Sequence, residues 1–287
     1  MNVKFTKTHK AAFAIAATAA LLAACGSTTA STTASASAAS DCTKASLTTL
    51  TAGKLTVATG QPAYSPWVED DKPESGNGFE SAVAYAVATK LGYANADVTW
   101  VRTTFDGAIT PGPKTFDFNL QQYTITDDRK KAVDFSSPYY TTPQAVVSIK
   151  GSKIASATTL AELKGAKLGA GVGTTAVDII TSQIGATPSV FNDNAAAVAA
   201  LKNGQIDGIV VDLPTAFYLT AAEIDNGVIV GQLPATSTGD NFGLLLAKDS
   251  PLTACVSKAV DALKADGTLA ALADKWLGAS AGAPVLK

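Results

Sequence analysis

Only two arginines occur in this chain of 287 residues, Arg102 and Arg129, and the other 20 basic residues are lysines. Arg129 lies in the segment TITDDR, close to glutamine, tyrosine and threonine side chains. A guanidinium group presents a rigid fork of N–H donors that matches the two oxygens of a carboxylate, whereas an ammonium group is a point charge. The sequence therefore suggests that Arg129 grips a planar anion. The alternative is that Arg129 lies on a solvated helix face beside the two preceding aspartates.

Histidine chemistry is excluded from the mature chain. The single histidine, His9, lies in an N-terminal segment that we expect to be removed. Without histidine there is no imidazole general base, no Ser-His-Asp or Cys-His arrangement and no histidine metal ligand. We therefore expect no catalytic residues, no metal and no cofactor.

The N-terminus has the pattern of a bacterial lipoprotein signal. Residues 1–24 start with three lysines and continue with an apolar run, residues 11–22, that is too short to span a bilayer. The run ends in Leu-Ala-Ala-Cys, which resembles a lipobox, so Cys25 is expected to carry fatty acyl chains such as palmitate and to become the new N-terminus. The alternative is an ordinary export signal with an incidental cysteine.

The residues after Cys25 predict a tether. Residues 25–40 are a Ser/Thr/Ala tract without an apolar period, which indicates a flexible linker that holds the protein at the outer face of the cell membrane. Cleavage would leave 19 basic and 24 acidic side chains, a net charge of −5, and this mildly acidic balance argues against nucleic acid as a partner. About 247 residues remain, enough for two lobes or one large domain.

Two further cysteines, Cys42 and Cys255, form an even pair in a chain that we expect to be exported. Such a pair favours a disulfide, here between the start of the folded region and a C-terminal helix. Two free buried thiols are the alternative.

Strand-like and helix-like segments alternate from residue 54 onward, which predicts an α/β fold with mostly parallel sheets. A break near residues 145–152 and a return near 242 predict two lobes with two hinge crossovers: 41–146 plus 242–287, and 147–241. Thr126 and Asn194 are the expected N-caps of two helices. The expected strands are 54–59, 98–103, 116–121, 145–150, 166–171, 189–193 and 207–213, with two more near 228–234 and 242–248.

Several motifs, in order over residues 54–278, resemble the extracellular solute-binding proteins of family 3, the polar amino-acid receptors of bacterial ABC importers. The most specific is TITDDRKKAVDFSSPYY. The others are KLTVAT, PAYSPW, GFESAVAYAVATKLG, TFDGAI, LKGAKLGAGVGTTA, NGQIDGIVVDLPTAFYL and LKADGTLAALADKWLG. The resemblance implies a two-lobed, type II periplasmic-binding-protein-like fold whose lobes close on a ligand.

The resemblance also implies roles for individual residues. Arg129 is similar to the residue that binds the ligand α-carboxylate, and Asp212 to the residue that binds the α-ammonium group. The other expected ligand contacts are Thr124, Thr174, Thr175, the aromatic walls Tyr64 and Phe79, and Trp67, Gln61 and Gln122. Each has a structural alternative: the aromatic residues could belong to the core, the threonines could cap a helix, and Asp212 could cap a helix at Pro214.

The resemblance implies a monomeric, lipid-anchored receptor that passes an amino acid to an ABC permease and its ATPase. The alternatives are an enzyme on the same fold, similar to cyclohexadienyl or arogenate dehydratase, or a ligand-sensing module. Gln61 stands where the family often has an aspartate that binds cationic ligands, which disfavours lysine and arginine as ligands.

Overall fold

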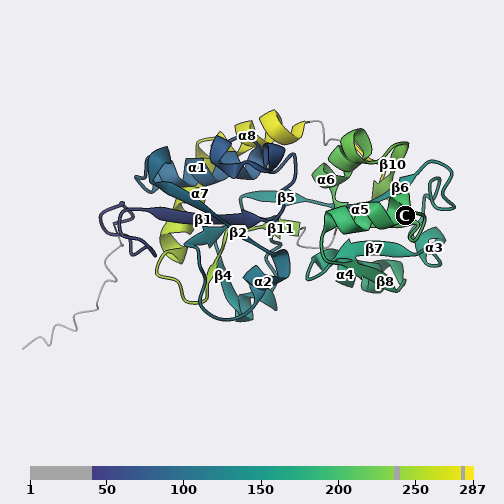
Figure 1. The fold of residues 1–287 in the computed structure, drawn as a ribbon, viewed down its shortest axis with the longest axis horizontal. Coiled ribbons are helices and arrows are strands. Elements are labelled where there is room, and N and C mark those ends of the chain that lie inside the picture. The colour runs from purple at the N-terminus through teal and green to yellow at the C-terminus, as the bar shows by residue number, and fades with distance from the viewer. Residues whose placement is uncertain (1–40, 236–239, 279–281) are drawn as a thin grey trace, which may run out of the picture. The chain divides into compact units, whose positions relative to one another are not determined.

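The computed structural model describes residues 41–235, 240–278 and 282–287. The expected signal segment, Cys25 and the tether lie outside the described residues. The described chain forms two α/β lobes, each with its own five-stranded sheet, and a two-stranded sheet lies where the chain crosses between them (Figure 1). The expectation of a two-lobed α/β fold with two crossovers is confirmed.

Lobe 1 is built on the sheet that contains β1. Its strands follow the order β2 (Val98–Thr103), β1 (Leu55–Gly60), β3 (Phe118–Asn119), β12 (Leu245–Ala247) and β4 (Val133–Phe135). The first three strands run parallel, and β12 is antiparallel to both of its neighbours. Every residue of β1 is buried, as expected for a central strand covered on both faces.

Lobe 2 repeats this arrangement. Its strands follow the order β10 (Gly227–Gln232), β6 (Gln144–Ile149), β9 (Gly208–Asp212), β7 (Leu168–Gly171) and β8 (Pro188–Phe191). The last three run parallel, and β6 is antiparallel to its two neighbours. Each large sheet therefore holds two parallel and two antiparallel pairings. The sheets are mixed rather than mostly parallel, because one strand in each, β12 in lobe 1 and β6 in lobe 2, runs antiparallel to both of its neighbours.

The crossover sheet pairs β5 (Tyr140–Thr142) with β11 (Asp240–Phe242) in antiparallel register. β5 leads directly into β6, so lobe 2 begins at about residue 143, slightly earlier than the expected 147. The C-terminal residues 282–287 were expected in lobe 1, and this is wrong. Leu286 lies in the lobe 2 core, and Val285 bridges to Gln232 of β10.

Helices cover both sheets. The helices of lobe 1 are α1 (Phe79–Lys90), α2 (Phe105–Ile109), α7 (Thr253–Ala265) and α8 (Thr268–Leu277). Those of lobe 2 are α3 (Leu160–Leu163), α4 (Thr175–Ile179), α5 (Asn194–Lys202) and α6 (Leu213–Tyr218). Short 3-10 turns lie at Glu69–Asp71, Pro73–Ser75, Asn95–Asp97 and Arg129–Lys131, and π-helical turns extend α4 and α6 over Ile180–Ile184 and Leu219–Glu223.

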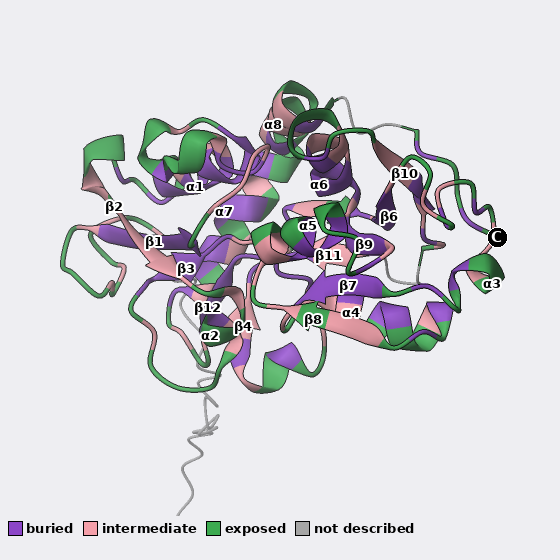
Figure 2. Cartoon of the chain, turned by 45° about the vertical axis from the view of Figure 1, so that its right-hand side comes forward, coloured by how far each residue is buried: buried purple, intermediate pink, exposed green. Residues whose placement is uncertain are grey.

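The two lobes have different cores. Lobe 1 packs α1, α7 and α8 together over the sheet, with aromatic residues Trp67, Phe79, Tyr139 and Phe242 in one cluster. Lobe 2 is aliphatic, and neighbouring residues of β6 point to opposite faces: Val146 packs with α4, and Val147 with α5 and α6. Figure 2 shows buried residues along β7 and β9, between these helices.

A disulfide joins Cys42 to Cys255 across 213 residues. It ties the segment before β1 to α7, and Cys255 is part of the lobe 1 core. Both cysteines of this disulfide belong to lobe 1, so the bond cross-links segments within that lobe.

Two local expectations need correction. The strand expected over 116–121 is only two residues long, because the Asp117 side chain takes over local hydrogen bonding by accepting from the backbone N–H groups of Leu50 and Thr56. The N-cap of α5 is Asp193 rather than Asn194: its Oδ1 accepts from the Ala196 N–H at 2.8 Å.

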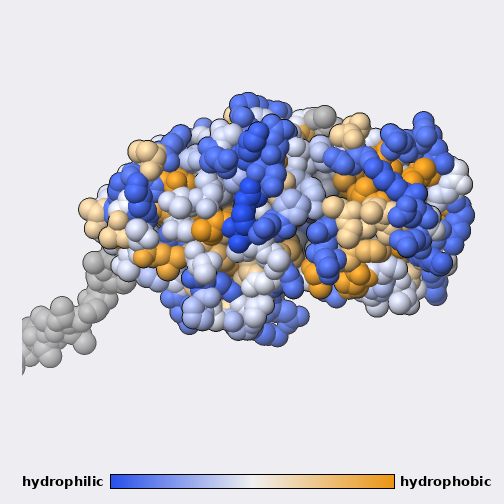
Figure 3. Space-filling model, in the orientation of Figure 1, coloured by the Kyte–Doolittle hydropathy of each residue, from blue (hydrophilic) through white to orange (hydrophobic). Residues whose placement is uncertain are grey.

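Apolar surface in Figure 3 gathers over lobe 2 around α5. That helix is rich in alanine, whose methyl groups add little area each. The large apolar side chains exposed among the described residues are Leu50, Val190 and Val285, one from lobe 1 and two from different parts of lobe 2.

Candidate functional site

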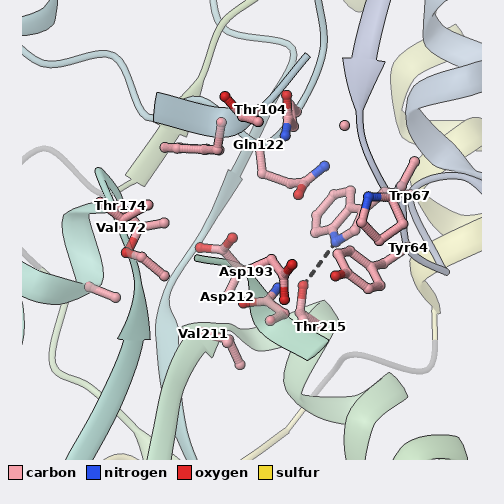
Figure 4. A pocket seen from close by; sticks show the side chains of 18 of the residues that line it. Tyr64, Trp67, Thr104, Gln122, Val172, Thr174, Asp193, Val211, Asp212 and Thr215 are labelled. Carbon is pink, nitrogen blue, oxygen red and sulfur yellow. Dashed lines mark hydrogen bonds between the residues drawn. The ribbon is translucent and has the colours of Figure 1, made fainter. Parts of the chain in front are cut away.

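The parallel strands of both sheets point their carboxyl ends at one cavity of about 180 Å³. In open α/β sheets, ligands bind at such ends, because the connecting loops there present backbone and side-chain groups that no core needs. The lining residues follow β1, β2, β3, β7, β8 and β9, and they come from both lobes. The labelled residues in Figure 4 surround this space.

The turn after β1, residues 61–68, forms one wall and contains Gln61, Tyr64 and Trp67. The carbonyl oxygen of Tyr64 accepts from the N–H groups of Trp67 and Val68. The start of α1 closes the turn: its first N–H groups donate to the carbonyls of residues 66 and 67 at 2.9 Å. A side chain at Gly78 would come within 2.5 Å of the Trp67 carbonyl, so glycine is required for this contact.

Arg102, the other arginine, holds the same turn from outside. Its guanidinium donates to the carbonyl oxygen of Gly60 at 2.8 Å and to the carboxylate and carbonyl of Asp71. Asp71 in turn accepts from the N–H of Ala63. Both arginines therefore bind carbonyl oxygens with a fork, but Arg102 stabilises the wall and does not line the cavity.

Trp67 is 1% exposed and bridges the lobes. Its indole Nε1–H donates to Thr215 Oγ1 at the start of α6, at 2.9 Å (Figure 4). Its ring packs edge-on against Phe79, 6.1 Å between centroids. Phe79 is fully buried in the lobe 1 core and does not line the cavity, so its expected role as an aromatic wall is wrong. As the first residue of α1, it points toward the other core residues of that helix.

Arg129 lines the cavity from lobe 1 and is 8% exposed. Thr126 Oγ1 accepts from its backbone N–H at 3.1 Å, but the helix is a single 3-10 turn whose N-cap residue is Asp128 rather than the expected Thr126. The guanidinium donates to the carbonyl oxygens of Thr124 (2.7 Å) and, across the cleft, Gly173 (2.8 Å), and stacks over Phe105. The solvated-face alternative is excluded by this burial.

Gln122 is held in place by a buried carboxylate. Its backbone has a positive φ of 54°, and both its N–H and its side-chain amide donate to Glu80. Tyr139 donates to the same carboxylate. Burial raises the pKa of Glu80 to about 7, and the hydrogen bonds from Tyr139 and Gln122 counteract part of that rise. Glu80 thus fixes a cavity residue 42 positions away in the sequence.

Two threonines at the start of α4 line lobe 2, but their hydroxyls differ. Thr174 Oγ1 donates to the carbonyl oxygen of Gly171 at 2.7 Å. Thr175 Oγ1 accepts from Gln144 Nε2 at 2.7 Å, so its own proton is available to another acceptor. Gln144 also lines the cavity, and its buried Oε1 has no hydrogen-bond partner among the described residues. Thr175 is therefore the better donor toward a carboxylate in the cavity.

Asp212 ends β9 and lines the cavity opposite Arg129. It is the N-cap residue of α6, but its side chain makes no capping hydrogen bond. Burial raises the pKa of Asp212 to about 8, with further contributions from the charges of Asp240 and Glu80, and Arg129 acts in the opposite direction. A carboxylate held without a hydrogen-bonding cap in this environment would gain from a cation placed against it.

The cavity also has residues that the sequence did not single out. They include Thr104, Phe105, Gln144, Val172, Asn192, Asp193, Val211 and Thr215. Most follow the carboxyl end of a parallel strand, and that positional rule was the available signal. Gln144 and Thr215 lie outside that rule, because an antiparallel strand and a helix carry them.

The described residues contain no group of three or more histidine, cysteine, aspartate or glutamate side chains that could hold a metal ion. None of the helices in the described ranges is both long and apolar enough to cross a membrane.

Two lobes with one cavity between them, lined by the carboxyl ends of parallel strands, define a binding protein of the periplasmic type. The chain belongs to the bacterial extracellular solute-binding proteins, family 3, whose model matches residues 55–279.

The chain is similar to named proteins in sequence and in structure. The chain is 31% identical to the L-cystine-binding protein TcyJ of Escherichia coli K12 over 204 residues, 70% of this chain and 74% of the relative. It is 31% identical to a probable histidine-binding protein of Campylobacter jejuni over 271 residues, 92% and 96% of the two chains. The solved structure of an ancestral arginine-binding protein bound to arginine has a TM-score of 0.65 and 33% identity, covering 78% of this chain and 98% of its own.

Proposed function

We propose that this protein captures an amino acid between its two lobes and delivers it to an ABC importer. The observation that carries the proposal is the position of Arg129 and Asp212, one on each lobe, in the lining of a single cavity. The relatives named for cystine, histidine and arginine binding support the ligand class.

Arg129 and Asp212 can offset the main energetic cost of binding a zwitterion, which is the removal of its two charges from water. Removing a carboxylate and an ammonium group from water costs several kcal/mol for each charge unless both are paired. Arg129 supplies a cation with free N–H groups, since two of its five donors bind backbone carbonyls. Asp212 supplies a carboxyl group that would ionise against the ligand ammonium, because a nearby cation offsets the burial that raises its pKa, and Thr124 and Thr175 supply neutral partners.

Closure then depends on ligand. Arg129 belongs to lobe 1 and Asp212 to lobe 2, so an amino acid bridges the lobes with its own two charges. This supports a receptor whose lobes swing about the β5 and β11 crossovers, as in hinge-type binding proteins. A permease and its ATPase would then receive the closed form, which is how a binding protein rather than an enzyme works.

We further propose that Cys25 is acylated after removal of residues 1–24, and that residues 25–40 tether the receptor to the outer face of the membrane as a monomer. Growing cells on a clickable palmitate analogue should label the wild-type protein. Cys25→Ala should abolish the label and release the protein from the membrane fraction. Equal labelling of both would refute the anchor.

Calorimetry with a panel of amino acids tests the central proposal. Arg129→Lys should weaken binding of any ligand by about 1.5–3 kcal/mol, because a bidentate fork becomes a point charge. Arg102→Lys is the matched comparison: it also loses a guanidinium fork, but one that holds the turn after β1 and does not line the cavity, so it should weaken binding less than Arg129→Lys. Unchanged affinity in Arg129→Lys, or no amino acid bound by the wild type, would contradict the proposal.

A further inference from the structure

Three residues with formal charges line the cavity in the described chain: Arg129, Asp193 and Asp212. The proposed α-carboxylate would pair with Arg129 and the α-ammonium with Asp212. Asp193 would then be a third charge without a partner. A ligand with a second positive charge would give Asp193 an ionic partner and balance the charges in the cavity.

One carboxylate oxygen of Asp193 is available to a ligand. The residue follows β8 and caps α5, with Oδ1 accepting from the Ala196 N–H at 2.8 Å. Within the described ranges no residue donates a hydrogen bond to Oδ2. The cap of α5 uses one carboxylate oxygen of Asp193. The side chain lines the cavity, and its second oxygen can accept a hydrogen bond from a ligand there.

Tyr64 faces Asp193 from the other lobe. Its hydroxyl oxygen is buried and has no hydrogen-bond partner in the described structure. Tyr64 and Asp193 line the same cavity, and the pKa of Tyr64 is raised by burial first and then by the charge of Asp193, whereas the backbone of Ala195 lowers it. Figure 4 shows Tyr64, Asp193 and Asp212 around the same space.

An aromatic face together with a carboxylate is a recognition site for a cation. The carboxylate pairs with the charge, and the ring attracts it by about 0.5–2 kcal/mol depending on desolvation. Gln61 and Asn192 add neutral amide groups to the same cavity, and these can accept hydrogen bonds from ammonium or guanidinium N–H groups.

We infer that Asp193 and Tyr64 form a subsite for a positively charged side chain, so that the ligand is an amino acid with a side-chain ammonium or guanidinium group. This inference rests on the proposed function and specifies its ligand class. The neutral side chain of Gln61 had disfavoured lysine and arginine as ligands, and this inference reverses that expectation. Gln61 lines the cavity from lobe 1, but Asp193 lines the same cavity from lobe 2 and supplies a negative charge.

Asp193→Asn with a matched pair of ligands tests the subsite. Asparagine caps helices as well as aspartate does, so the substitution removes the charge and keeps the cap. L-arginine and L-citrulline have side chains of the same length and nearly the same shape, but only arginine is charged. Calorimetry should show the wild type binding arginine at least about 10-fold more tightly than citrulline. In Asp193→Asn, arginine should bind about 10- to 100-fold more weakly while citrulline changes less than about 3-fold.

Asp178→Asn is the control, because Asp178 is an exposed lobe 2 carboxylate outside the cavity lining, and the arginine-to-citrulline ratio should not change. An unchanged ratio in Asp193→Asn, or a wild type that prefers citrulline, would overturn the subsite and leave amino-acid binding standing. Equal loss of both ligands with a lower melting temperature would assign Asp193 a structural role and also overturn it. A wild type that binds no amino acid would overturn the proposed function itself.

Discussion

The two walls of the cavity divide its chemistry between them. Among the described lining residues, lobe 1 contributes the aromatic rings and the cation, Arg129, whereas lobe 2 contributes the two carboxylates, Asp193 and Asp212, and both lobes contribute amides and hydroxyls. Neither wall alone can neutralise a zwitterion. If the protein binds an amino acid as proposed, recognition depends on both lobes, and binding is coupled to their closure.

The walls also differ in how firmly they are held. Lobe 1 fixes its wall with polar contacts, Arg102 to the turn after β1 and the buried carboxylate of Glu80 to Gln122, and its core contains aromatic residues and the disulfide. Lobe 2 relies on aliphatic packing and on the starts of α4, α5 and α6. We therefore expect lobe 1 to be the preformed half of the proposed site, and the lobe 2 carboxylates, Asp193 and Asp212, to pair with positive charges of a ligand.

The largest expected effect comes from removing a lobe 2 charge. Asp212→Asn should weaken amino-acid binding by about 2–5 kcal/mol, because the ligand ammonium loses its ionic partner. It should also stabilise the ligand-free protein. The pKa of Asp212 is raised to about 8, so the folded carboxyl retains a proton that the unfolded chain has lost, and stability falls as pH rises from about 4 toward 8.

The melting temperature of Asp212→Asn without ligand should therefore exceed that of the wild type by a few degrees at pH 8, and by less at pH 5. Thermal melts at the two pH values measure this. A variant that melts lower than the wild type at pH 8 would instead identify Asp212 as a helix cap and break the contrast between the walls.

Removing the disulfide tests the firmness of lobe 1. Cys42→Ala with Cys255→Ala should lower the free energy of unfolding by about 2–5 kcal/mol, since an uncrosslinked unfolded chain gains entropy. All three tryptophans, Trp67, Trp100 and Trp276, belong to lobe 1, so their fluorescence reports that lobe. The fluorescence transition in urea should shift to lower concentration, ahead of the far-UV circular dichroism signal that includes lobe 2. Coincident transitions with unchanged midpoints would show that the lobes do not differ.

The smallest effect should come from the bridge between the walls. Thr215→Val removes the acceptor of the Trp67 indole N–H and should cost about 0.5–1.5 kcal/mol of closure, or about 3- to 10-fold in Kd for every ligand alike. Thr220→Val, whose hydroxyl bonds only within lobe 2, is the control. A change in ligand selectivity rather than in overall affinity would place Thr215 in the recognition site.

Local patterns in the sequence predicted most of the elements. The four-residue spacing in α1, the apolar run of β9 and the alternation of strands with helices gave the two lobes, because periodicity reflects which face of an element is buried. The motif around Arg129 and the aspartate of VVDLP predicted two residues that line one cavity.

The predictions that were wrong concern residues whose positions depend on contacts with other parts of the fold. Phe79 and Tyr64 are both aromatic residues near the same turn, yet one is core and the other lines the cavity, because α1 packs its first residue inward. Asp193 and Asn194 are both good caps, and β8 determines which of them the helix uses. The C-terminal tail is too short to show a period, so its place on lobe 2 could not be predicted.

The sequence by itself determined the inventory: one arginine in a polar motif, no histidine after residue 9, and strands and helices in the order of two α/β lobes. Those features depend on residue type and on local spacing, which every chain carries along its length. The tertiary structure alone decided which side chains meet. The hydrogen bond from Trp67 to Thr215 joins the two lobes, and the hydrogen bonds from Gln122 to Glu80 join distant segments within lobe 1. Asp193 and Tyr64 line one cavity from different lobes. Each of these pairs is far apart in the chain, and only folding brings its members within reach.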